Sequence, residues 1–321
     1  MTGGQFVSNC TADAMALAAH ALKSGALVAF PTETVYGLGA DATSAQAVAR
    51  IYAAKGRPAD HPLIVHIADM HDIAEWSDDI PQYAIALARN FWPGPMTLIL
   101  KRSTLVQDFI SGGQETVGLR VPNHVVALGL LNEFKKIGGK GIAAPSANRF
   151  GHVSPTTADA VEAELSAYLA SEDLILDGGQ SLVGVESTII DCTTESPKIL
   201  RPGAITESMI EEVTKIELSY DATDIRVSGS LDNHYSPMAH VLLDIEPQPG
   251  DGFIALSHFE TPEGVIRLAS PKNDEEFARH MYAALRSADT QKLARVVVKQ
   301  PEGSGIAIAI RDRLQRASNG R

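Results

Sequence analysis

Two cations that could do chemistry, Lys55 and Arg57, stand two residues apart just after an expected helix over 44–54. An arginine offers planar bidentate donors and a lysine a point charge, so together they can hold a phosphate. Pro58 and Pro62 indicate that the loop carrying them is stiff. Cations also complement the C-terminus of a helix, so a purely structural cap is the alternative explanation.

Small polar groups gather where two strands of the expected sheet end. The segment FPTETVYGLG, residues 30–39, follows an apolar run, and its glycines Gly37 and Gly39 are expected where the backbone turns. Pro145-Ser146-Ala147-Asn148 follows an expected strand over 142–144. Hydroxyl and amide groups at strand ends suit a phosphate or a ribose, because ligands of α/β proteins usually sit there. A tight turn with a satisfied polar network is the alternative in both places.

Two arginines and one serine lie next to further apolar runs. Arg120 stands near the end of an expected strand over 116–121, and Arg201 follows a short apolar run. A buried arginine pairs with an anion, which is either a carboxylate of the protein or a group of the ligand. Ser187, in the segment VESTI, belongs to no GxSxG or SxxK motif, so we expect a hydrogen-bonding group and not a nucleophile.

Several familiar sites do not occur in the sequence. It has no GxxxxGK[ST] loop, and Gly37 and Gly39 lack the third glycine of a dinucleotide fingerprint. The ten histidines show no HExxH spacing, and Cys10 and Cys192 form no CxxC pair. A tightly bound transition metal is therefore not expected.

An alternating α/β framework is needed to bring these segments together. Helical periodicity predicts helices over 12–23, 44–54, 82–91 and 157–169, and short apolar runs predict strands near 26–30, 63–67, 97–101, 116–121, 142–144, 174–176 and 188–191. The polar, non-periodic stretch 218–238 indicates a connection between domains. Beyond it, strands near 240–243, 253–256 and 295–298, with helices over 275–285 and toward Arg316, predict a small α/β domain.

Length and charge set further limits. A chain of 321 residues exceeds the usual size of one hydrophobic core, so two domains are expected. The net charge is −12, and residues 1–235 hold 16 Lys and Arg against 28 Asp and Glu, while residues 236–321 hold 11 of each. Broad adhesion to nucleic acid is therefore not expected, and an anionic substrate needs a local cluster of cations. Because neither a signal peptide nor a membrane-spanning apolar run occurs, the expected location is the cytoplasm.

In their order and spacing, FPTETVYGLG, KGRP, GLRVP, PSAN and VESTI resemble the YrdC-like threonylcarbamoyl-AMP synthase family in its longer two-domain form. The resemblance implies a twisted open mixed α/β sheet with a central cavity in a catalytic domain over 1–217. It also implies a linker that acts as a lid over 218–238 and a smaller Rossmann-like α/β domain over 239–321.

The resemblance further implies a reaction and its partners. L-threonine, bicarbonate and ATP would give L-threonylcarbamoyl-AMP and diphosphate by nucleotidyl transfer, with Mg²⁺ held through the ATP phosphates. The product would then pass to a threonylcarbamoyl transferase complex that acts on tRNA. Neither a membrane nor strong direct binding of nucleic acid is expected.

The family's site residues carry over position by position. The resemblance implies catalytic roles for Lys55 and Arg57, ATP contacts by Arg57, His61, Thr116, Ser146, Asn148, Ser154, Arg201 and Tyr235, and threonine or carbamate contacts by Thr34, His66, Arg120, Ala144 and Ser187. Tyr235, in the segment HYSP, would lie over the ligands. His61 stands where the family commonly has Asn, and an imidazole can still donate a hydrogen bond.

Two other functions remain open from the sequence alone. One is a module that holds a nucleotide or RNA in the same cavity without turnover, although the acidic composition counts against an RNA footprint. The other is a related carbamoyl transfer within a larger enzyme, as in hydrogenase maturation, and the chain lacks the zinc-finger cysteines expected there.

Overall fold

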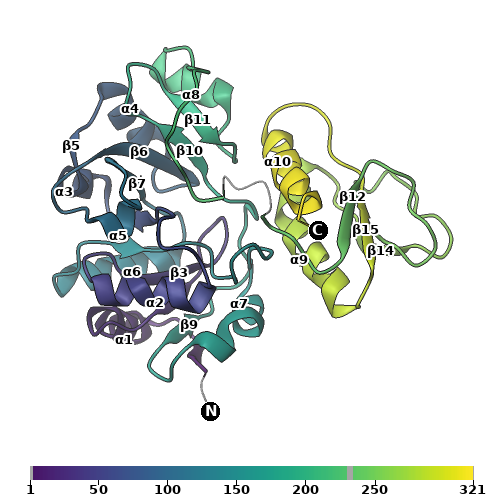
Figure 1. Cartoon of the computed structure of the whole chain (residues 1–321), viewed down its shortest axis with the longest axis horizontal. Helices are drawn as coiled ribbons and strands as arrows, with labels where there is room; N and C mark the ends of the chain where they lie inside the picture. The colour runs from purple at the N-terminus through teal and green to yellow at the C-terminus, as the bar shows by residue number, and fades with distance from the viewer. Residues whose placement is uncertain (1–2, 230–233, 321) are drawn as a thin grey trace.

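The computed structural model describes residues 3–229 and 234–320, which form two sheets with helices packed against them (Figure 1). The larger sheet is mixed, with neighbouring strands in the order β1-β9-β2-β3-β8-β4-β7-β6-β10-β11 and β5 paired to β6. Its strands are β1 (Gln5–Val7), β2 (Val28–Phe30), β3 (Gly37–Asp41), β4 (Ile64–His66), β5 (Ser77–Asp79), β6 (Met96–Arg102), β7 (Thr116–Arg120), β8 (Ile142–Ala143), β9 (Leu174–Leu176), β10 (Thr188–Asp191) and β11 (Lys198–Arg201). The expected mixed α/β class is confirmed.

Helices cover the larger sheet and begin at residues suited to capping. Thr11 accepts a hydrogen bond from the backbone of Ala14 at the start of α1, and Ser44 does the same for Ala47 at the start of α2. The helices of this unit are α1 (Ala12–Lys23), α2 (Ala45–Lys55), α3 (Ile73–Trp76), α4 (Gln82–Phe91), α5 (Asp108–Ser111), α6 (Val125–Lys136), α7 (Ala158–Leu165) and α8 (Glu207–Thr214), with 3₁₀ turns at Met70–Asp72 and Ser166–Tyr168.

The expectation that Gly37 and Gly39 mark a turn is wrong, because both lie within strand β3. This strand pairs antiparallel with β2, with Phe30 opposite Gly37. A Cβ atom at Gly39 would lie 2.7 Å from Ile142 Cγ2 and 2.8 Å from Phe30 Cε1, so glycine is required for close packing. The turn itself lies between the two strands, and it carries the polar residues of the segment.

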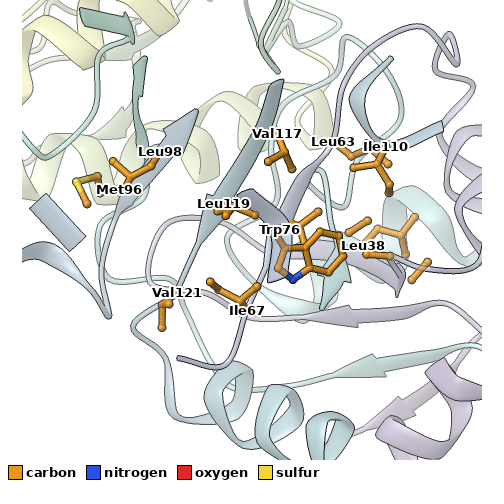
Figure 2. Packing of buried hydrophobic residues seen from close by; sticks show 14 of the residues in the cluster. Leu38, Leu63, Ile67, Trp76, Met96, Leu98, Ile110, Val117, Leu119 and Val121 are labelled. Atoms are coloured by element: carbon orange, nitrogen blue, oxygen red, sulfur yellow. The ribbon is translucent and has the colours of Figure 1, made fainter. Parts of the chain in front are cut away.

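The core of this unit holds the cavity-forming strands in place. Trp76 is fully buried, and Figure 2 shows it between Leu119 and Leu38 among the buried residues of one cluster. All four residues of β10 are buried, as expected for a strand covered on both faces. Such packing leaves the strand ends as the places where polar side chains can converge.

The smaller sheet is wholly parallel, in the order β12-β15-β13-β14. Its elements are β12 (His240–Leu243), β13 (Gly252–Ile254), β14 (Ile266–Ala269), α9 (Asp274–Thr290), β15 (Arg295–Val298) and α10 (Ile306–Ser318). Helices α9 and α10 lie between this sheet and the larger unit (Figure 1). One buried hydrophobic cluster joins Val153 and Val185 of the larger unit to Tyr282 and Leu314 of these helices.

The chain between α8 and β12 passes back along the larger unit. Arg226 accepts and donates backbone hydrogen bonds with the side chain of Gln114, at 3.0 and 2.7 Å. Residues 230–233 of the predicted linker lie outside the described residues. Within 3–229 and 234–320, none of the helices combines the length and the apolar character that crossing a membrane requires.

Candidate active site

The main cavity lies among loops that leave the large sheet, and the empty space in and around it, open solvent at its mouth included, is about 760 Å³. It collects residues from the β2–β3 turn, the loop after α2, the ends of β4 and β7, the segment before β10 and the chain after α8. The residues predicted from the sequence that line it are Thr34, Lys55, Arg57, His61, His66, Arg120, Ala144, Ser146, Ser187, Arg201 and Tyr235. The structure therefore brings together eleven side chains spread over 202 positions of sequence, which local pattern alone does not explain.

The ammonium of Lys55 is held by the loop that follows β8. Its Nζ donates to the backbone oxygens of Ser146, at 2.6 Å, and of Asn148, at 2.5 Å. Burial and then the charge of Arg57 lower the pKa of Lys55 well below its ordinary value. Lys55 is the last residue of α2, as the helix-terminus alternative expects, but its Nζ donates to the loop after β8, and Arg149 is the side chain that donates to Ala54 O.

Arg57 lines the cavity from the loop that follows α2. Its Nη2 donates to Pro62 O at 2.9 Å and to Ser228 Oγ at 3.2 Å. Burial lowers the pKa of Arg57 to about 10, so it remains a cation at neutral pH.

Arg201 is fixed by backbone oxygens on two sides. Its Nε and Nη2 donate to Ser187 O at 3.2 and 3.0 Å, and its Nη1 donates to Ser228 O at 2.8 Å. Among the residues that the structure describes, no carboxylate forms an ion pair with Arg201. The guanidinium is thus oriented by neutral acceptors and keeps its charge available to a ligand.

The cavity lining also includes one paired arginine and neutral polar groups. Arg120 Nη2 lies 2.7 Å from Glu33 Oε1, so the protein-carboxylate alternative holds for this residue. Arg120 Nε and His66 Nδ1 are buried and have no hydrogen-bond partner within the described chain. Burial and then the charge of Arg120 lower the pKa of His66 to about 3, so its imidazole is neutral. Unpartnered donors beside a guanidinium suit a small ligand that carries a carboxylate.

Three predicted residues lie outside the main cavity. Thr116 lines a neighbouring space of about 300 Å³, which shares Ile64 and Ser228 with the main cavity. Asn148 Nδ2 donates to the backbone oxygens of Arg149 and His152, and so it shapes the loop after β8. Ser154 is fully buried and donates to Glu186 Oε1 at 2.7 Å.

Some residues at the cavity were not predicted. Ser228 and Glu186 line it directly, while Tyr282 of α9 and Arg313 of α10 hydrogen-bond to Glu186. Tyr282 stacks on Tyr235, with ring centres 5.8 Å apart and planes at 26°. Glu186 stands inside the VESTI segment, so that motif could have identified it as a site residue. Nothing near Tyr282 or Arg313 in the sequence indicates a site.

Two family models match consecutive parts of the chain. The model described as "Telomere recombination" covers residues 20–203, and the model described as "Threonylcarbamoyl-AMP synthase, C-terminal domain" covers residues 205–319. The threonylcarbamoyl-AMP synthase of Pyrococcus abyssi is 39% identical over 94% of this chain and 93% of its own length. This chain belongs to the threonylcarbamoyl-AMP synthase family. The Bacillus subtilis member is 38% identical over 96% of this chain and 93% of its own.

A solved member of the family has the same overall arrangement. The crystal structure of P. abyssi Sua5 complexed with L-threonine aligns with a TM-score of 0.86 and 36% identity, covering 100% of this chain and 98% of that one. The match includes both sheets, so the placement of α9 and α10 against the larger unit belongs to the family's two-domain form.

Proposed function

We propose that this protein is an L-threonylcarbamoyladenylate synthase, a nucleotidyltransferase that joins L-threonine, bicarbonate and ATP. The observation that carries the proposal is that two sets of polar groups line one cavity. Lys55, Arg57 and Arg201 form the first set, which we assign to the phosphate half, and Arg120 beside the neutral His66 forms the second, which we assign to the amino acid half. A triphosphate suits the first half and an amino acid carboxylate suits the second.

The individual roles follow from this division. Lys55, Arg57, His61, Ser146, Arg201 and Tyr235 would contact ATP, and Thr34, His66, Arg120, Ala144 and Ser187 would contact threonine or its carbamate. Thr116 would reach the nucleotide from the neighbouring space, while Asn148 and Ser154 act by holding loops. The P. abyssi relative was solved in complex with L-threonine, which supports threonine as a ligand of this cavity.

The chemistry needs positioning and charge more than a protein nucleophile. The amine of threonine attacks the carbon of bicarbonate-derived CO₂ and loses a proton, which gives a carbamate that is labile in water. A carbamate oxygen then attacks the α-phosphorus of ATP, and diphosphate leaves with the electron pair of the broken P–O bond. Lys55, Arg57 and Arg201 stabilise the charge that builds on the phosphates, and the enclosing linker excludes water.

The proposal includes Mg²⁺ that arrives with ATP. The two carboxylates nearest the cavity, Glu33 and Glu186, are each paired with an arginine, at 2.7 Å in both cases. The ligands left for the metal are then the phosphates themselves, which is a common arrangement for Mg²⁺ in nucleotide sites. The ion would neutralise phosphate charge during transfer.

The same proposal places the protein upstream of tRNA modification. A threonylcarbamoyl-adenylate is an activated acyl phosphate, so a transferase complex must take it up and deliver the group to tRNA. The excess of acidic residues over 1–235 favours delivery through that complex over direct binding of tRNA. We place this work in the cytoplasm, where the substrates are found.

The test is a measurement of diphosphate release under omission of single substrates. We expect release only when threonine, bicarbonate, ATP and Mg²⁺ are all present, with threonylcarbamoyl-AMP detected by mass spectrometry. Equal release without threonine would refute the synthase. Tight, salt-sensitive binding of RNA by a protein without turnover would favour the nucleic-acid module instead.

A further inference from the structure

A carboxylate at the wall of the cavity is held from the smaller domain. Glu186 is 6% exposed and lines the cavity next to Ser187. Its Oε2 accepts a hydrogen bond from Arg313 Nε at 2.7 Å and from Tyr282 Oη at 2.9 Å. Arg313 and Tyr282 belong to α10 and α9, and neither has any exposed surface. A residue of the larger unit therefore depends on two side chains of the smaller one.

The charge of Glu186 matters because of where it lies. Burial by itself would raise its pKa, but Arg313 and then Arg201 outweigh burial and lower the pKa to about 2, so the carboxylate is ionised. An ionised carboxylate without a partner would repel a triphosphate in the same cavity. Asp312 also contacts Arg313, so the guanidinium balances charge on both of its sides.

Arg313 also touches two other parts of the site. Its Nη2 donates to Pro202 O at 2.9 Å, directly after Arg201. Its guanidinium lies 5.4 Å from the centre of the Tyr235 ring, within the range of a cation–π contact. One side chain thus connects the segment before β10, the residue after β11 and the linker tyrosine.

We propose that Arg313 is a positioning residue through which the smaller domain neutralises Glu186 and completes the nucleotide half of the cavity. The inference rests on the proposed function, because it takes ATP as the anionic ligand. Arg313 does not touch the ligand; it acts through Glu186. A purely structural contact between the domains would stabilise the protein without changing nucleotide affinity.

The structure offers a matched control for that distinction. Arg286 of α9 pairs with Glu164 of α7 at 3.1 Å, which is a second ion pair between the two units. Neither residue lines the main cavity. Arg286→Met should therefore weaken the contact between domains, as Arg313→Met does, but without leaving a bare carboxylate at the nucleotide.

The experiment measures the Kd of the full-length protein for ATP by calorimetry, with no threonine present, together with the Tm. We expect Arg313→Met to weaken ATP binding by about tenfold, or ~1.4 kcal/mol. Glu186→Gln, which removes the charge and keeps the shape, should leave ATP binding unchanged or tighter. The double variant Arg313→Met/Glu186→Gln should recover wild-type ATP affinity to within about threefold. The control Arg286→Met should lower the Tm and leave the Kd for ATP unchanged.

Weaker ATP binding by Arg313→Met, with no weakening by Glu186→Gln, is the decisive result, since a purely structural contact would leave the ATP affinity of both variants unchanged. Equal ATP affinity losses in Arg313→Met and Arg286→Met, or no recovery in the double variant, would overturn the inference. If Arg313→Met does not fold, Glu186→Gln and Arg313→Lys decide, and weaker ATP binding by Glu186→Gln overturns it. A wild-type protein that binds ATP but needs no threonine for diphosphate release would refute only the proposed reaction.

Discussion

At the scale of single residues, the cations of the cavity are oriented by acceptors that carry no formal charge. Lys55 is held by two backbone oxygens, Arg57 by Pro62 O and Ser228 Oγ, and Arg201 by Ser187 O and Ser228 O. Such partners fix direction without neutralising the cation, in contrast to the carboxylate that pairs with Arg120. The phosphate half and the amino acid half of the cavity therefore differ in available charge.

Arg57→Ala should separate catalysis from folding. The change removes charge stabilisation from the phosphate half and two hydrogen bonds at the cavity edge. We expect turnover to fall by roughly 10²–10³, the size seen when one stabilising donor is lost, with little change in Tm. Diphosphate release and thermal unfolding measure the two effects, and a near-normal rate would remove Arg57 from the catalytic machinery.

Lys55→Met should affect both turnover and stability. The buried Nζ of Lys55 satisfies two backbone oxygens. Buried acceptors left without donors cost about 1–3 kcal/mol each, so the Tm should fall as well. Lys140→Met is the control, because Lys140 is half exposed and pairs with the exposed Glu75. A wild-type Tm in Lys55→Met would contradict the structure.

At the scale of elements, local pattern predicted most helices and strands but not all. The helices α1, α2 and α4 match their predicted ranges, because each has a clear apolar period, and Thr11 and Ser44 cap α1 and α2. Helix α6 was not predicted, since Gly129 interrupts it and its N-cap is the side chain of His124, an uncommon capping residue. Strand β3 was taken for a turn because glycines that serve close packing look like glycines that serve turns.

Gly184→Ala should weaken the contact between the segment before β10 and α9. Gly184 has φ of +82°, and a Cβ atom there would lie 2.4 Å from both Ala278 O and Arg279 Cα. We expect a loss of stability of about 1–3 kcal/mol, measured by chemical denaturation. Gly250→Ala is matched to it, with φ of +90° and nothing within 4 Å of the added atom. Equal losses in both variants would show that strain alone, and not α9, sets the cost.

At the scale of the whole molecule, the order of motifs predicted the cavity, while the contribution of the smaller domain could not be predicted. Eleven of the predicted residues meet in one space because strand ends in an α/β sheet converge. The partner of Glu186 lies 127 residues further on, in a helix whose sequence carries no motif. Burial and pairing at that distance follow only from the docking of two domains.

The acid stability of the whole molecule should depend on Glu186. Its pKa is about 2 in the folded protein against an ordinary 4.5, so the stabilisation is complete above pH 4.5 and is lost as pH falls toward 2. We expect the free energy of unfolding of the wild-type protein to drop over this range by a few kcal/mol more than that of Glu186→Gln. Denaturant titrations from pH 7 to 3 compare the two, and parallel curves would contradict the buried ion pair.

The uneven charge of the chain also has a consequence for kinetics. Residues 1–235 carry a net negative excess, yet they enclose the cations Lys55, Arg57 and Arg201. Within a Debye length of the acidic surface, about 10 Å at 0.1 M salt, an approaching nucleotide meets repulsion, and only at the mouth does it meet attraction. Moderate salt should therefore raise the association rate of ATP in stopped-flow measurements, whereas electrostatic steering would make it fall. Screening of the surface charge would then set the rate at which ATP enters the cavity. Contacts inside the cavity would set how long ATP stays bound.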